Sequence, residues 1–204
     1  MEKTNLKLFD KWDEKDVKVN DVSLSKYLNL QNKRIPHSFG KHAKKRFEKS
    51  EVSIVERLVN KLMRSGQGKR KLSGKYIRGR GNTGKKLKAM KIVETTFEKI
   101  EKQTKQNPLQ VLVKAIEHSA PREDTTRLKK GGISYTLSVD VSPQKRVDEA
   151  IKNLSLAAFA SSFNNKTAVS DALAKELILA SKEDAQSFSV KRRDEIERIA
   201  KSSR

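Results

Sequence analysis

Apolar residues recur three or four positions apart in six stretches of the chain, and this spacing gives an α-helix one buried face. The expected faces are Ile54, Val55, Leu58, Val59, Leu62 and Met63; Leu87, Met90, Val93, Phe97 and Ile100; Leu109, Leu112, Val113 and Ile116; Val147, Ala150, Ile151, Leu154 and Ala158; Val169, Ala172, Leu173 and Leu177; and Ile196 with Ile199. A short turn of helix is expected within residues 21–28. The pattern therefore predicts a mainly helical chain.

Four of the six helices also have a start signal. Ser53 and Glu56 form a capping-box pair before the first helix, in which each side chain accepts from a backbone N–H at the helix start. Thr83 is expected to cap the second helix. Pro108 and Pro143 stand at first helical positions, where the missing proline N–H would have had no partner inside the helix.

The apolar period changes to two between Ile133 and Val141, where polar residues alternate with apolar ones as in a strand with two unlike faces. Gly131-Gly132 is a hairpin turn signal, and residues 125–130 before it supply the partner strand. The expected fold is mainly α, a bundle of about six helices with a protruding two-stranded β-hairpin at about 124–141. An isolated hairpin is only marginally stable, so a partner is expected to support it.

The chain of 204 residues is long enough for one domain with appendages. Residues 1–33 are expected to form an N-terminal arm, with Trp12 packed on the body rather than stacked on a base. Residues 34–204 are expected to form a single helical domain. Its segment at about 66–84 is rich in glycine and in lysine or arginine, which predicts a basic loop that cannot pack a core but can follow phosphates.

Positive charge is concentrated in two windows. The chain has 46 Lys and Arg against 25 Asp and Glu, a net charge of +21. Between Val22 and Phe47 there are seven basic residues and no acid, and between Arg57 and Val93 there are thirteen and again no acid. Solvated surfaces mix both signs, so this separation predicts a polyanionic partner.

Nucleic acid is the leading candidate for that partner, and an anionic membrane surface is the alternative. No apolar run approaches the roughly 18 residues that a membrane span needs, and the charged N-terminus has no apolar signal core. A membrane-surface protein also needs aromatic residues opposite a basic helix face, whereas these helices have aliphatic faces. We therefore expect a cytoplasmic protein without a membrane partner.

No constellation in the sequence supports catalysis. The absence of cysteine excludes thiolate metal sites and cysteine nucleophiles. The three histidines lack metal-site spacing, and GNTGKK departs from the phosphate-binding loop pattern. We expect no enzyme, no catalytic residue, no metal and no cofactor. Aromatic residues make up only 5% of the chain, too few for single-strand stacking, so folded RNA read through its phosphates and shape fits better.

Six blocks of sequence occur in a distinctive order: IPHSFGKHAKKRF, VERLVNKLMR, NTGKK, NPLQVLVKAIEHSAPREDTTR, GGISYTLSVDVSPQKRVDEAI and DEIERIAKS. Together they resemble the universal small-subunit ribosomal protein seven family, called protein five in eukaryotic naming, in its archaeal or eukaryotic type. The resemblance implies a structural constituent that binds the 3′ major domain of small-subunit ribosomal RNA and nucleates head assembly. It also implies neighbouring head and platform proteins, and a hairpin near exit-site transfer RNA and the messenger RNA exit path.

The resemblance and the charge windows together select the expected RNA-binding residues. Those carried over from family motifs are Arg34, His37, Lys41, Lys44, Lys45, Arg46, Lys85, Lys86, Arg122, Lys145 and Arg146. The hairpin adds Arg127, Lys129 and Lys130. An inserted basic stretch, at about 68–80, departs from most relatives and adds Lys69, Arg70, Lys71, Arg78 and Arg80.

A general architectural nucleic-acid binder is the alternative function. Such a protein also combines a helical body with β-arms, but it inserts apolar wedges from the arm tips between base steps. The tip here is KKGG with Ile133 at its edge, which favours the ribosomal interpretation.

Overall fold

The computed structural model describes residues 7–31, 34–40, 47–66, 71–72, 75–76 and 84–204. In these residues the elements are α1 (Val22–Ser25), the 3-10 helix η2 (Glu48–Glu51), α2 (Ile54–Leu62), β1 (Lys71–Leu72), β2 (Lys75–Tyr76), α3 (Lys86–Thr104), α4 (Pro108–Ser119), β3 (Glu123–Lys130), β4 (Ile133–Asp140), α5 (Pro143–Ser162), α6 (Val169–Ser181) and α7 (Phe188–Ser202). The six longer helices and the hairpin confirm the expected fold class.

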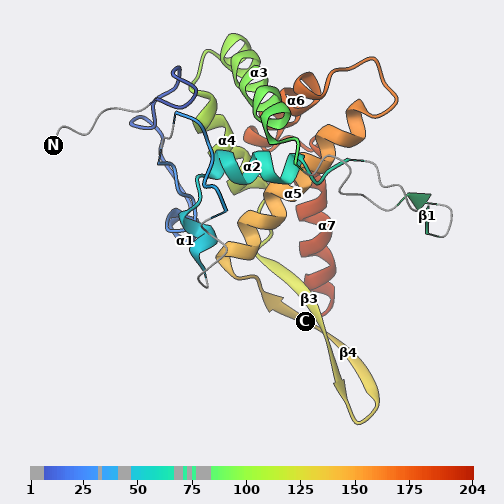
Figure 1. The fold of residues 1–204 in the computed structure, drawn as a ribbon. Helices are drawn as coiled ribbons and strands as arrows, with labels where there is room; N and C mark the ends of the chain where they lie inside the picture. The colour runs from blue at the N-terminus through green and yellow to red at the C-terminus, as the bar shows by residue number, and fades with distance from the viewer. Residues whose placement is uncertain (1–6, 32–33, 41–46, 67–70, 73–74, 77–83) are drawn as a thin grey trace.

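The helices enclose one apolar core. α6 packs against α3, α4 and α5, and α2 lies against α3 and α5 (Figure 1). Phe97 of α3, Leu112 of α4 and Leu154 of α5 are fully buried in this core. Apolar faces at helical spacing thus explain the arrangement, because each helix can remove its face from water only against another one.

The described N-terminal residues, 7–31, lie along the helical body rather than apart from it (Figure 1). Leu8, Trp12 and Leu24 belong to the same buried cluster as the helices. The Trp12 ring meets Phe97 edge-to-face at 5.6 Å between centroids, and its indole N–H donates to Glu101 at 3.0 Å. Trp12 therefore packs on the body, as the sequence predicted; the boundary at residue 33 stays a prediction.

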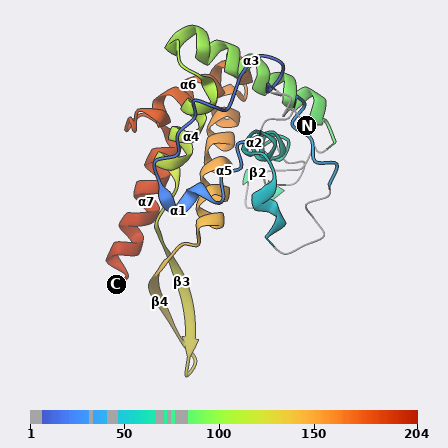
Figure 2. The same cartoon turned by 90° about the vertical axis from the view of Figure 1, so that its left-hand side faces the viewer.

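The hairpin extends away from the helices with the base of β3 beside α7 (Figures 1 and 2). β3 and β4 are antiparallel, with Lys130 opposite Ile133 and Glu123 opposite Asp140. Gly131 and Gly132 have φ of +58° and +80°, the positive values that a tight two-residue hairpin turn requires. The predicted turn is therefore confirmed.

The sequence predicted the N-cap position of α2 correctly, but its capping box and the predicted N-cap of α3 were wrong. Ser53 is at the N-cap of α2, but its side chain makes no capping bond, and the Glu56 carboxylate turns instead to Ser38 and Lys86. The N-cap of α3 is Lys85, two residues after Thr83; Thr83 itself lies outside the described residues. For Glu56, partners distant in the sequence thus replace the expected local capping bond.

Leu87 was wrongly assigned to the buried face of α3, since its relative exposure is 75%. Two successive steps of three residues, from Leu87 to Val93, turn the helix face by about 120° because each residue advances about 100°. The core sits on the side of Val93 and Phe97. In α7, Ile199 is likewise 45% exposed.

The segment expected as a basic loop at 66–84 contains the paired strands β1 and β2.

Candidate nucleic-acid interface

The predicted RNA-binding residues fall into three regions, of which the structure describes parts. Arg34 and His37 lie before α2, and Lys85 and Lys86 lie at the start of α3. The residues on or beside the hairpin of β3 and β4 are Arg122, Arg127, Lys129, Lys130, Lys145 and Arg146. Eight predicted residues lie outside the described residues, namely Lys41, Lys44, Lys45, Arg46, Lys69, Arg70, Arg78 and Arg80. The backbones of Lys71 in β1 and Lys130 in β3 are described within their strands.

Glu56 fixes the first region to the second. This buried carboxylate accepts from the Ser38 N–H and hydroxyl, each at 2.8 Å, and from the Lys86 ammonium at 2.6 Å. Burial alone would raise the pKa of Glu56, but these donors outweigh burial and hold the pKa below its usual value. Glu56 is therefore an ionised anchor that holds residues 34–40 near the N-terminus of α3.

The segment before α2 presents polar and aromatic groups at the surface. Arg34 is exposed and its Nε donates to Asp10 at 2.8 Å. His37 is half-buried, with Nδ1 accepting from the Phe39 N–H at 2.8 Å and its ring 4.2 Å from the Phe39 ring. Phe39 itself is 79% exposed. The low aromatic content of the chain gave no indication of this exposed ring, which can pack on RNA.

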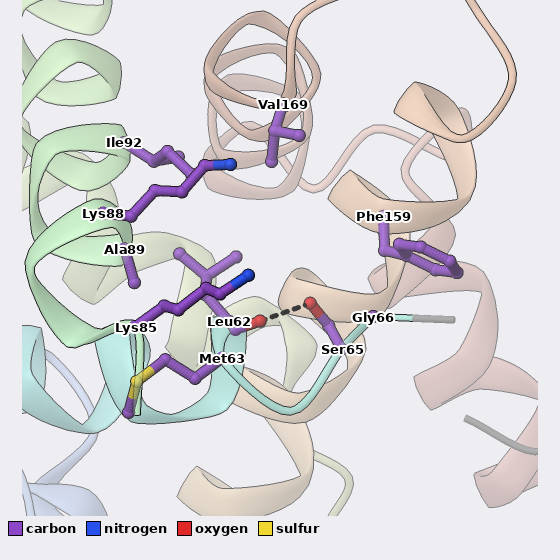
Figure 3. A pocket seen from close by; sticks show the side chains of 10 residues that line it. All are labelled: Leu62, Met63, Ser65, Gly66, Lys85, Lys88, Ala89, Ile92, Phe159 and Val169. Carbon is purple, nitrogen blue, oxygen red and sulfur yellow. Dashed lines mark hydrogen bonds between the residues drawn. The ribbon is translucent and has the colours of Figure 1, made fainter. Parts of the chain in front are cut away.

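The start of α3 contributes cations around a cavity of about 140 Å³. Lys85 and Lys88 are exposed and extend from α3 toward the side of Phe159 and Val169 (Figure 3). Lys86, in contrast, turns toward Glu56 and its side chain is only 17% exposed. Sequence reasoning missed Lys88, although its spacing of three residues from Lys85 places both lysines on one side of the helix.

The hairpin has two unlike faces because residues opposite each other in the register point to the same side. Arg127 pairs with Thr136 and Lys129 with Ser134, which makes one face polar and basic. Leu128 lies opposite Tyr135 on the other face, and both side chains are about half exposed. Arg127 and Lys129 are exposed, so the described cations of the hairpin are free to meet an anionic surface.

The base of the hairpin holds Arg122 and Lys145. The Arg122 side chain is exposed, and its backbone N–H donates to Glu197 at 2.8 Å. Lys145 pairs with Asp124 at 2.8 Å while its side chain remains 58% exposed. Burial raises the pKa of Asp124, but Lys145 and the Thr125 N–H outweigh it and lower that pKa overall. An exposed pair of this kind is weak, so Lys145 can exchange its partner for a phosphate.

Arg146 points into the protein instead. Its guanidinium donates to Asp21 at 2.9 Å and to the Ser23 hydroxyl at 2.6 Å, and the residue is 6% exposed. The motif therefore places Lys145 at the surface and Arg146 in the body, where it fastens α1 to α5. A positioning role fits this placement better than the predicted direct contact with RNA.

Within the described residues, no three His, Asp or Glu side chains come close enough to hold a metal ion. The helices seen there are also too short or too polar to cross a membrane. The described surface therefore carries cationic side chains before α2, at the start of α3 and along the hairpin.

Comparison with known proteins identifies relatives along nearly the whole chain. Residues 24–204 match the family described as ribosomal protein S7p/S5e. The small ribosomal subunit protein uS7 of Methanothermobacter thermautotrophicus is 46% identical over 195 residues, which is 96% of this chain and 97% of that protein. The protein of the same name from Methanosphaera stadtmanae is 48% identical over 198 residues, 97% of this chain and 98% of that one.

Proposed function

The chain belongs to the ribosomal protein S7p/S5e family, whose members are structural and not enzymatic, and from this premise we propose that it binds ribosomal RNA. Its expected site is the 3′ major domain of the small-subunit RNA, where it nucleates head assembly beside neighbouring head and platform proteins. The two acid-free windows carry this proposal, because they hold twenty basic residues in a chain of net charge +21.

The division of charge between body and windows explains how one protein can be both folded and strongly cationic. Acidic residues such as Glu56 and Asp21 are used inside the structure as partners of cations. Lys85, Lys88 and Arg127 remain exposed. Phosphate contacts release counterions, so the affinity should fall steeply as salt rises.

We propose that the hairpin contacts a second ligand rather than the ribosomal RNA. Its tip projects beyond the helices, and β4 is exposed along nearly its whole length. Such an arm contributes little to the core and can reach a ligand next to the head. We assign it exit-site transfer RNA and the messenger RNA exit path as neighbours.

The test for ribosomal RNA uses a transcript of the 3′ major domain in filter binding across a salt series. Each phosphate contact should add about 0.7–0.9 to the log–log slope. Reversing Lys44, Lys45 and Arg46 to Glu should abolish specific binding while circular dichroism shows intact helices. Reversing Lys102, Lys175 and Lys201 changes the charge equally outside the proposed site and is the control. A folded first variant that binds normally would refute the assignment.

The test for the hairpin replaces the tip residues Lys129, Lys130 and Ile133 with serine. Head incorporation in reconstituted subunits should be normal, because the core does not depend on the tip. Retention of exit-site transfer RNA should fall. Lost incorporation with normal retention would reverse the two roles.

A further inference from the structure

A cluster of cations lies between α2 and α5, and none of its residues is among those that the sequence predicts to bind RNA. Lys61 and Arg64 line two adjoining hollows, of about 170 Å³ and 250 Å³. The first hollow also contains Lys49, Arg57 and Asp148, and the second contains Lys152. Lys61 and Arg64 are therefore the two cations that line both hollows.

The charges in this cluster do not balance. Asp148 pairs with Lys49 and, at 3.3 Å, with the buried Arg57, so its carboxylate is already used twice. Lys152 has its own partner, Glu149, at 2.7 Å. Among the described residues no acid pairs with Lys61 or Arg64. Five cations thus share two carboxylates, and the partial charge of about −0.5 at the end of a helix such as α2 does not offset the difference.

Lys61 is partly buried, which distinguishes it from ordinary surface lysines, whereas Arg64 beside it is exposed. Lys61 is half-buried, and the backbone N–H of Arg64 donates to the Lys61 carbonyl at 3.0 Å, so both side chains belong to one helical turn. Burial lowers the pKa of the Lys61 ammonium, Asp148 raises it, and three neighbouring cations lower it further. A half-buried ammonium without an anion is costly, and a bound anion would remove that cost.

We propose that Lys61 and Arg64, with Lys152 beside them, form a binding site for a backbone phosphate of RNA. This site rests on the proposed function, and it adds a specific contact that the proposed function does not specify. The hollows favour a phosphodiester because their walls offer several N–H donors, with the Asn60 amide among the lining groups. Arginine and lysine grip phosphate oxygens by charge-assisted hydrogen bonds, and the partly buried setting is screened less by salt than an exposed one.

The test compares two double variants in the full chain, with the 3′ major domain transcript as the probe. Lys61→Met with Arg64→Met removes both charges and keeps the apolar stems. Lys175→Met with Lys201→Met removes two exposed charges elsewhere and is the matched control. The first pair should lower affinity about tenfold and the log–log salt slope by about 1–2, whereas the control should stay within about twofold.

Ethylation of single phosphates in the transcript identifies the contact directly. Ethylation of one or two adjacent phosphates should reduce binding of the transcript by the wild type and by the control variant. Ethylation of the same phosphates should not reduce binding by the Lys61/Arg64 variant. Arg64 is exposed, so Arg64→Met alone should reduce the salt slope by about 0.7–0.9 even if the double variant folds poorly.

The outcomes separate this site from the proposed function. A wild type that binds the transcript no better than unrelated RNA would refute the proposed function. A wild type that binds specifically, with affinity and interference pattern unchanged in the folded Lys61/Arg64 variant, would overturn the phosphate site alone. Competition by inorganic phosphate that requires Lys61 and Arg64, with an unchanged interference pattern, would show a free-anion site and also overturn it.

Discussion

Replacing Arg146 with methionine tests whether this residue holds the fold together or contacts RNA. Methionine keeps the apolar stem but removes the guanidinium, so Asp21 loses its 2.9 Å partner and the Ser23 hydroxyl loses its 2.6 Å donor. Because Arg146 and Asp21 are 125 positions apart in the sequence, their pair ties α1 to α5. The variant should therefore loosen the N-terminal segment.

The magnitude depends on how buried each partner is. Removing one side of a fully buried ion pair costs about 3–5 kcal/mol. The Arg146 side chain is 8% exposed, but the Asp21 side chain is 22% exposed and still accepts from the Ser23 N–H at 2.9 Å. We therefore expect a loss of about 2–3 kcal/mol, or roughly 5–10 °C in the melting temperature for a chain of this size.

Urea unfolding followed at two signals measures the effect. Circular dichroism reports the helices, and Trp12, the only tryptophan, reports the N-terminal segment. A double-mutant cycle with Asp21→Asn should give a coupling of about 1–2 kcal/mol. Unchanged unfolding together with a smaller salt slope of RNA binding would refute the reasoning and make Arg146 a direct RNA contact.

The pair also predicts a pH dependence. Burial raises the pKa of Asp21, but hydrogen bonds from Ser23 and Arg146 outweigh it, so the folded pKa lies below 3.8. The stabilisation is complete above pH 3.8 and is lost as the pH falls through the lower folded pKa. The stability difference between wild type and Arg146→Met should therefore shrink in acid, and a constant difference would contradict the ionic mechanism.

Three further predictions concern stability. Glu176→Ala should lower the free energy of unfolding in urea by about 3 kcal/mol. The buried Oε1 accepts from the Ser187 and Ser189 hydroxyls and from the Ser189 N–H, and the variant leaves these donors without that acceptor. An unchanged unfolding midpoint would contradict this. Leu87→Gln should cost less than about 0.5 kcal/mol and Met90→Ala about 2–4 kcal/mol, and similar losses would contradict the observed face of α3. Glu56→Gln should flatten the pH dependence of stability below pH 4.5, since the lowered pKa of Glu56 makes its contribution present above that pH and lost as acid protonates it.

Local patterns allowed the sequence to determine much of the fold. The apolar spacing of α4, from Leu109 to Ile116, and the Gly131-Gly132 turn require only neighbouring residues for their interpretation. Net charge and its concentration in two windows are likewise properties of the sequence itself. These features predicted a helical bundle with a projecting hairpin, together with a polyanionic partner.

The tertiary structure decided which charged residues face outward. Lys145 and Arg146 are adjacent in one motif, yet only Lys145 reaches the surface, because Arg146 pairs with Asp21, 125 positions earlier in the sequence. The sequence alone predicted that Glu56 caps α2, whereas in the structure Glu56 accepts from Lys86, thirty residues later. Lys61 became a candidate phosphate ligand only when α5 brought Lys152 beside it. Partners so distant in sequence are set by packing, because the energy of a charge depends on its burial and its neighbours in space.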